Sequence, residues 1–241
     1  MFNRCFPKYL LAALLAAFSF TGVFAQDDDI NEYIFDVGQF TTLKVTDNVN
    51  VIYRCNPDST GKVTYHAAPD FADAFIFTKS GDTLRVQVTT DDVGKPGLPT
   101  IRVYSDYLNK VENQSDFKIK VEHPAPCPEF TAAVVGNGSI SVEGIKSTKV
   151  TAKVTAGMGN IFLTGTCADV KFRITGTGAI HADQLASQTA ICKILGGGSI
   201  GVNASKLLKI SGIGSTKIFY LGNPIIKHSG GGKLIHANPK Y

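Results

Sequence analysis

Five basic residues recur at a near-constant interval in the second half of the 241-residue chain. They lie 16 to 20 residues apart, and all but the first stand three residues before a glycine-rich segment: Lys153, Arg173, Lys193, Lys209 and Lys227. Lys153 fits this pattern after a shift of one residue. If the interval reflects a structural repeat, we expect the five side chains to stack in one column on an outward face. Neighbours in such a column repel by roughly 1 kcal/mol in water, so the column favours a polyanionic partner.

An acidic glycan or the phosphates of a lipopolysaccharide would suit this column. Nucleic acid is not expected, because no aromatic side chains alternate with the cations. Two other interpretations stay open: the cations form a solvated face that discourages aggregation, or they pack against the acidic first half of the chain. Residues 26–135 carry 10 Lys and Arg against 17 Asp and Glu, whereas residues 136–241 carry 12 against 3. The net charge of +4 therefore conceals two halves of opposite sign.

Acidic residues are scarce in the second half, where Glu143, Asp169 and Asp183 are the three carboxylates. On the expected repeat, Glu143 and Asp183 share an outward position two rungs apart, about 9.6 Å, which is a poor separation for glycoside hydrolysis. His181 and Asp183 share an outward face with Asn203 of the next coil. Together with Glu143, these residues form a polar patch that could hold a sugar or a weakly bound metal, but such columns are more often plain solvent surface. We expect no catalytic residues, no cofactor and no resident metal.

The elements that position these residues follow from an internal repeat. A G-x-G segment followed by an apolar residue recurs about every 19 residues, a spacing typical of a solenoid. The six copies begin at Gly136, Gly157, Gly176, Gly196, Gly212 and Gly230. Apolar and polar residues alternate with period two after each copy, as in Ile140 and Val142, which predicts short strands with one buried face. The repeat therefore predicts an all-β chain with a β-helix of about six coils in residues 131–241.

Residues 26–130 read as β structure without the repeat. Alternating runs predict strands over residues 43–53, 62–66, 83–89, 100–104 and 117–121, separated by turn-forming segments. A proline-rich stretch, residues 123–128, marks the boundary and is either a linker between domains or an extended connection onto the solenoid. Because the ends of a solenoid expose unpaired backbone, we expect this acidic region to cap one end and residues 238–241 to terminate the other.

The first 25 residues have the pattern of a secretory signal peptide, with Arg4 and Lys8 before an apolar run and cleavage expected after Ala25. We therefore expect export to the periplasm, the outer surface or the medium, without a transmembrane segment. Four cysteines remain in the mature chain: Cys55, Cys127, Cys167 and Cys192. An oxidising compartment permits disulfides without requiring them, and Cys55 with Cys127 is the favoured pair among three full pairings.

Several segments resemble an exported bacterial family, the putative auto-transporter adhesins with a head GIN domain. They are Phe35–Leu43, Ser80–Val86, the G-x-G coils, Gly214–Pro224 and Ser229–Gly232. The resemblance covers nearly the whole mature chain and implies a right-handed β-helix in the cell envelope or outside the cell. It supplies no catalytic residues. The chain departs from true autotransporters because nothing after residue 230 reads as an outer-membrane translocator.

The sequence thus favours an exported, non-catalytic protein of the cell envelope or surface that acts through contacts of its β-helix. Among the possible roles, the sequence favours adhesion. A module that binds acidic polysaccharide through the basic column is the alternative, and a glycan-active enzyme is less favoured. The expected partners are a surface or extracellular glycan, another polyanion or another protein. The sequence leaves the oligomeric state open.

Overall fold

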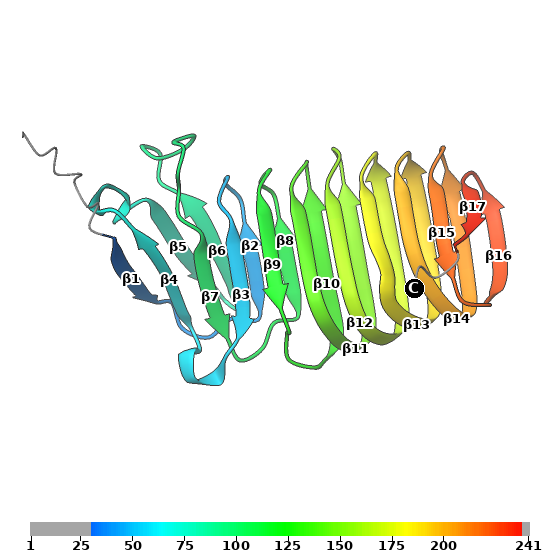
Figure 1. Ribbon diagram of the computed structural model, residues 1–241, viewed down its shortest axis with the longest axis horizontal. Coiled ribbons are helices and arrows are strands. Elements are labelled where there is room, and N and C mark those ends of the chain that lie inside the picture. Colours follow the sequence, from blue (N-terminus) through cyan, green and yellow to red (C-terminus); the bar gives the residue numbers. More distant parts are fainter. Residues whose placement is uncertain (1–29, 238–241) are drawn as a thin grey trace, which may run out of the picture.

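The computed structural model describes residues 30–237, which form one elongated β-solenoid (Figure 1). Seventeen strands belong to a single hydrogen-bonded set. Two short 3-10 turns, at Pro57–Ser59 and Pro69–Phe71, are the helical segments of this part of the chain. The expected signal peptide and the expected terminator at residues 238–241 lie outside the described residues.

Four long strands form the middle of the solenoid, and each bends about half-way along its length (Figure 1). They are β11 (Ser139–Thr155), β12 (Asn160–Gly176), β13 (Ala179–Gly196) and β14 (Ser199–Ile213). All neighbours pair in parallel, with register shifts at the bends. We call the N-terminal halves of these strands, with the strands that stack on them, the first face. The C-terminal halves and their neighbours form the second face.

Three short strands complete the C-terminal end. On the first face, β15 (Lys217–Leu221) pairs with β14 and β17 (Lys233–His236) pairs with β15. On the second face, β16 (Ile225–Gly230) pairs with β14. The register confirms the predicted repeat, because residues one repeat apart lie side by side: Ser139, Asn160, Ala179, Ser199, Lys217 and Lys233.

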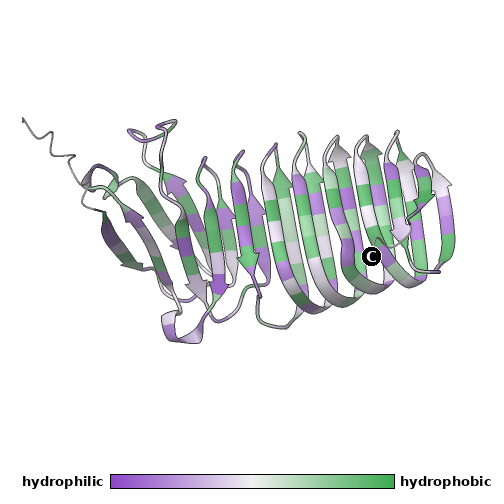
Figure 2. Cartoon of the chain, in the orientation of Figure 1, coloured by the Kyte–Doolittle hydropathy of each residue, from purple (hydrophilic) through white to green (hydrophobic). Residues whose placement is uncertain are grey.

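The core lies between the two faces. Inward positions on the first face are apolar and fully buried, as in Ile140, Ile161 and Ile180, while their sequence neighbours point to solvent. The same alternation holds on the second face, where Phe172 and Ile210 are buried, and it appears as bands of hydropathy along each strand (Figure 2). Because strand side chains point alternately to opposite sides, the period-two pattern fixes which residues form the core and which form the surface.

The G-x-G turns close the solenoid along one edge, and two features require their glycines. Gly198 has a φ of +102°, which side chains other than glycine rarely adopt. A Cβ at Gly198 would also lie 2.0 Å from the carbonyl oxygen of Gly178 on the preceding coil. The glycines therefore serve the close stacking of successive turns as well as the turn conformation itself.

The N-terminal region continues the same solenoid, although the sequence shows no repeat there. Its parallel strands are β2 (Thr42–Val45), β3 (Val51–Cys55), β6 (Thr83–Val88), β7 (Ile101–Ser105), β8 (Lys110–Asn113) and β9 (Lys118–Glu122). On the second face, β6, β2 and β8 follow one another and β8 pairs with β10 (Cys127–Val135). On the first face, β7, β3 and β9 lead to β11. The order of stacking thus differs from the order along the chain.

Three antiparallel strands cover the N-terminal end. They are β1 (Asn31–Asp36), β4 (Lys62–Ala67) and β5 (Phe75–Ser80), of which β4 pairs with β7 and β5 with β6. Tyr65 lies at the centre of an aromatic cluster, with ring centroids 5.2 Å from Tyr33 and 4.9 Å from Phe75. The proline-rich stretch after residue 122 is a connection between consecutive coils, because β9 and β10 lie on neighbouring rungs of the two faces.

The four cysteines of the described chain are free thiols, so the favoured disulfide between Cys55 and Cys127 does not form. Each of the two sulfurs has a polar partner of its own. Cys55 Sγ donates to the carbonyl oxygen of Asp106 at 3.3 Å, and Cys127 Sγ lies 3.1 Å from the hydroxyl of Ser147. Burial raises the pKa of Cys192 to about 12, which keeps this thiol neutral and unreactive.

Candidate functional site

Three of the five predicted cations stack on the second face. Lys153 pairs with Arg173, and Arg173 pairs with Lys193 on the next coil. The column does not continue to Lys209, because Lys193 pairs with Ser211. The expectation of one column of five cations is therefore wrong at this step.

Lys209 and Lys227 lie in the adjacent column, two residues earlier along each strand. Lys209 pairs with Ile191 on one side and with Lys227 on the other, and the same column contains Lys171 next to Ile191. Both columns point away from the core. We call these residues together the basic patch: Lys153, Lys171, Arg173, Lys193, Lys209 and Lys227.

The basic patch is free to meet a partner. All six side chains are exposed, and none of them forms an ion pair within residues 30–237. The acidic N-terminal region continues the same sheet and does not cover the patch. The interpretation that the basic column packs against the acidic region is therefore wrong. Unpaired cations on neighbouring rungs leave a positive potential that only ions or a ligand can neutralise.

A depression of about 270 Å³ lies within the patch, between Arg173 and Lys193 on one side and Ser211 and Gly212 on the other. Leu195 borders it and is 56% exposed. The missing side chain at Gly212 and the short one at Ser211 leave space beside the two cations. The sequence indicated the cations, but the depression depends on which residues the register places next to them.

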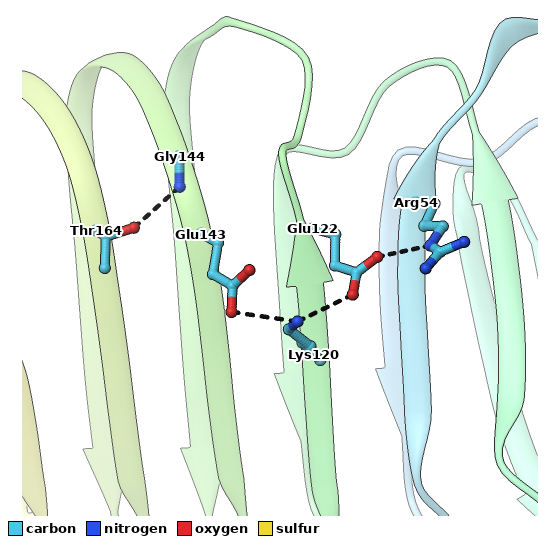
Figure 3. Close-up of polar contacts among 6 residues, drawn as sticks. All are labelled: Arg54, Lys120, Glu122, Glu143, Gly144 and Thr164. Carbon is cyan, nitrogen blue, oxygen red and sulfur yellow. Dashed lines mark hydrogen bonds and ion pairs between the residues drawn. The ribbon is translucent and has the colours of Figure 1, made fainter.

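The polar patch predicted on the first face is divided. Glu143 belongs to a row of ion pairs that crosses three neighbouring strands (Figure 3). Arg54 Nε lies 2.6 Å from Glu122, and Lys120 Nζ lies 3.0 Å from Glu122 and 3.3 Å from Glu143. The ammonium of Lys120 and the guanidinium of Arg54 lower the pKa of Glu122. Next to this row, Thr164 Oγ1 accepts a hydrogen bond from the backbone N–H of Gly144 at 3.0 Å. Glu143 thus has a structural partner and lies apart from Asp183.

His181 and Asp183 do lie together, around Gly201 of the next coil. Gly201 pairs with His181, and a Cβ built on it would lie 3.3 Å from Asp183 Oδ1. Asn203 follows two residues later on the same strand. The imidazole of His181 stacks on Phe162, with centroids 4.6 Å apart and an interplanar angle of 7°. This aromatic contact was not predicted from the sequence, although the repeat interval of 19 residues between Phe162 and His181 could have indicated it.

Glu143 and Asp183 are not neighbours on the first face. In the register of β11, β12 and β13, the strand β12 separates Glu143 from Asp183. Over residues 30–237, no group of three His, Cys, Asp or Glu side chains is arranged to hold a metal ion. Among the described residues there is also no helix long and apolar enough to cross a membrane.

The family of the chain follows from its sequence over the solenoid just described. The family model for the putative auto-transporter adhesin, head GIN domain, matches residues 39–224. The chain belongs to this family. The match runs from β2 to the turn after β15, so it includes the N-terminal coils as well as the glycine-rich ones. A comparison with curated proteins finds no match.

Solved structures share the fold of this head GIN chain at low sequence identity. A putative adhesin from Bacteroides fragilis is 19% identical, with a TM-score of 0.77 over 85% of this chain and 95% of its own. A putative lipid binding protein from Parabacteroides distasonis is 16% identical, with a TM-score of 0.65 over 87% and 98%. A putative adhesin from Parabacteroides merdae is 17% identical, with a TM-score of 0.63 over 87% and 95%. At these identities the likeness concerns the fold.

Proposed function

We propose that the protein is an exported, non-catalytic adhesin of the cell envelope or surface that binds an acidic polysaccharide through its basic patch. The observation that carries this proposal is the set of six exposed, unpaired cations on two adjacent columns of the second face. An extended polyanion can contact successive rungs at their spacing of about 4.8 Å, which suits a linear chain better than a compact anion.

The depression beside Arg173 and Lys193 supports a preferred position for one anionic group. Arg173 can hold a sulfate or carboxylate with two parallel hydrogen bonds, and Lys193 supplies a point charge on the next rung. Leu195 adds an exposed apolar edge that can contact the non-polar face of a sugar ring. Family membership supports the adhesive role, and the Bacteroides fragilis protein of similar fold is described as a putative adhesin.

Retention on immobilised heparin tests the proposal. We expect retention that falls as salt is raised, because exposed charges are screened. Arg173→Ala with Lys193→Ala should elute at clearly lower salt. The matched control is Lys217→Ala with Lys233→Ala, which removes the same charge from two exposed lysines of the first face.

Equal elution of the two double variants would attribute retention to net charge and refute a site at the basic patch. Failure of the wild-type protein to bind at physiological salt would refute polyanion binding altogether. Glu143→Ala and Asp183→Ala are expected to leave retention unchanged, because both residues lie on the other side of the solenoid.

A further inference from the structure

A column of aromatic side chains on the first face has one empty position. Successive outward residues on neighbouring strands are Phe162, His181, Gly201 and Phe219. Phe162 and Phe219 are 41% and 38% exposed, which is unusual for large apolar side chains in register on one surface. Gly201 interrupts the column between His181 and Phe219.

The empty position has the height of one ring. His181 and Phe219 are two rungs apart, about 9.6 Å, so a ring at the level of Gly201 would lie about 4.8 Å from each of their levels. The stacked pair of Phe162 and His181 shows that this spacing suits ring stacking here, since their centroids are 4.6 Å apart. One face of the His181 imidazole is covered by Phe162, and the other faces the level of Gly201.

Backbone geometry does not explain the glycine. Unlike Gly198, Gly201 does not adopt a positive φ, and the nearest atom to a Cβ built on it is Asp183 Oδ1 at 3.3 Å. Its neighbours Ile200 and Val202 are buried in the core as the alternation requires. A side chain could therefore be accommodated at this position by a small movement of Asp183, and its absence leaves the slot open.

Polar groups border the slot on one side. Asp183 Oδ1 lies 3.3 Å from the position of a Cβ built on Gly201, and Asn203 stands two residues farther along β14. Within residues 30–237, the side chains of Asp183 and Asn203 form neither a hydrogen bond nor an ion pair with protein groups. A carboxylate accepts hydrogen bonds from hydroxyl groups, and an amide both accepts and donates them.

We propose that the slot between His181 and Phe219 binds a pyranose ring of a neutral glycan. The C–H faces of the sugar would stack on the rings, whose faces carry partial negative charge, while its hydroxyl groups donate to Asp183 and exchange hydrogen bonds with Asn203. The site is separate from the basic patch, because it lies on the first face. The protein would then contact neutral and acidic sugars on opposite sides.

Titration calorimetry with cellohexaose and with the hexamer of N-acetylglucosamine tests this site. We expect binding of at least one of them at up to millimolar concentration, weakened at least about tenfold by Gly201→Tyr, which fills the slot. Ser141→Tyr is the matched control, because it adds a ring beyond Phe162 in the same column without entering the slot. Its affinity should stay within about twofold of the wild-type value.

His181→Ala keeps the test decisive if Gly201→Tyr fails to fold, because this exposed side chain forms one wall of the slot and its removal should weaken binding severalfold. Thermal unfolding of each variant checks the fold. Equal affinity of Gly201→Tyr and wild type, or no binding of either oligosaccharide, overturns the proposal. Binding of adenosine in place of both sugars, lost in Gly201→Tyr, also overturns it and assigns the slot to a planar base. Loss of heparin binding in the basic-patch variants does not change oligosaccharide binding at the slot. One proposal can therefore fail while the other holds.

Discussion

Two adjacent glycines of one turn are expected to respond oppositely to the same substitution. Gly198 has a φ of +102°, and a Cβ there would lie 2.0 Å from the carbonyl oxygen of Gly178. At Gly197 the φ is not positive, and the nearest atoms to a Cβ would be Ser215 Oγ and Thr177 Cγ2, both at 3.7 Å. Gly198→Ala should therefore be strongly destabilising, and Gly197→Ala should not.

The magnitude follows from two contributions. A non-glycine residue held at such a φ costs about 1–3 kcal/mol. Relief of the close contact requires the two turns to separate, which disrupts hydrogen bonds such as Ser199 N–H to Gly178 O at about 1 kcal/mol each. We expect Gly198→Ala to lower the free energy of unfolding by about 3–5 kcal/mol and the melting temperature by about 6–20 °C.

Gly197→Ala should stay within about 1 kcal/mol of wild type, and a small gain is expected because alanine restricts the unfolded chain. Chemical and thermal unfolding of both variants, followed by circular dichroism, measure the difference. Equal stabilities, or a cost below about 1 kcal/mol for Gly198→Ala, would refute the account of glycine stacking between coils.

Three further predictions concern the titratable groups Glu122 and Cys192. Glu122→Gln should lower the free energy of unfolding by about 0.5–1.5 kcal/mol at neutral pH, since it breaks the contacts with Lys120 and the half-exposed Arg54. Because the folded state lowers the pKa of Glu122, this stabilisation exists above the usual glutamate pKa and vanishes as pH falls through the folded value, so denaturation curves of the two proteins should converge in acid. Ellman's reagent at pH 8 should leave Cys192 unmodified in the folded protein and modify it after unfolding, since burial raises its pKa to about 12; rapid native labelling of Cys192 would contradict this burial. The same raised pKa predicts stability that is complete below about pH 9 and falls as pH rises toward 12, because only the unfolded chain releases the thiol proton there.

The glycine-rich coils could be predicted from the sequence because their physical cause is local. Each coil repeats a period-two strand and a turn that needs glycine, so pattern and interval are both visible. The N-terminal coils could not be predicted in the same way. There β2 and β3 stack between β6 and β7 on one side and β8 and β9 on the other, so coils adjacent in space are not adjacent in sequence and no period results.

The basic column was predicted only in part, for a definite reason. Alignment on the first glycine of each copy assumed that Gly212 stacks on Gly196. In the structure Gly212 pairs with Ile194, and Gly214 lies over Gly196. A Cβ built on Gly214 would lie only 1.7 Å from the carbonyl oxygen of Gly196. This difference of two residues moves Lys209 into the neighbouring column. The gap in the aromatic column could not be predicted, because the repeat interval alone does not show that Gly201 lies between His181 and Phe219.

The salt dependence of polysaccharide affinity is the sharpest test of binding through the basic patch. Isothermal titration of a heparin oligosaccharide at several salt concentrations gives the slope of log association constant against log salt, which reports the charges neutralised on binding. We predict a shallower slope and weaker binding for Arg173→Ala with Lys193→Ala, and wild-type values for Lys217→Ala with Lys233→Ala. Identical slopes for the two double variants would contradict recognition through the basic patch.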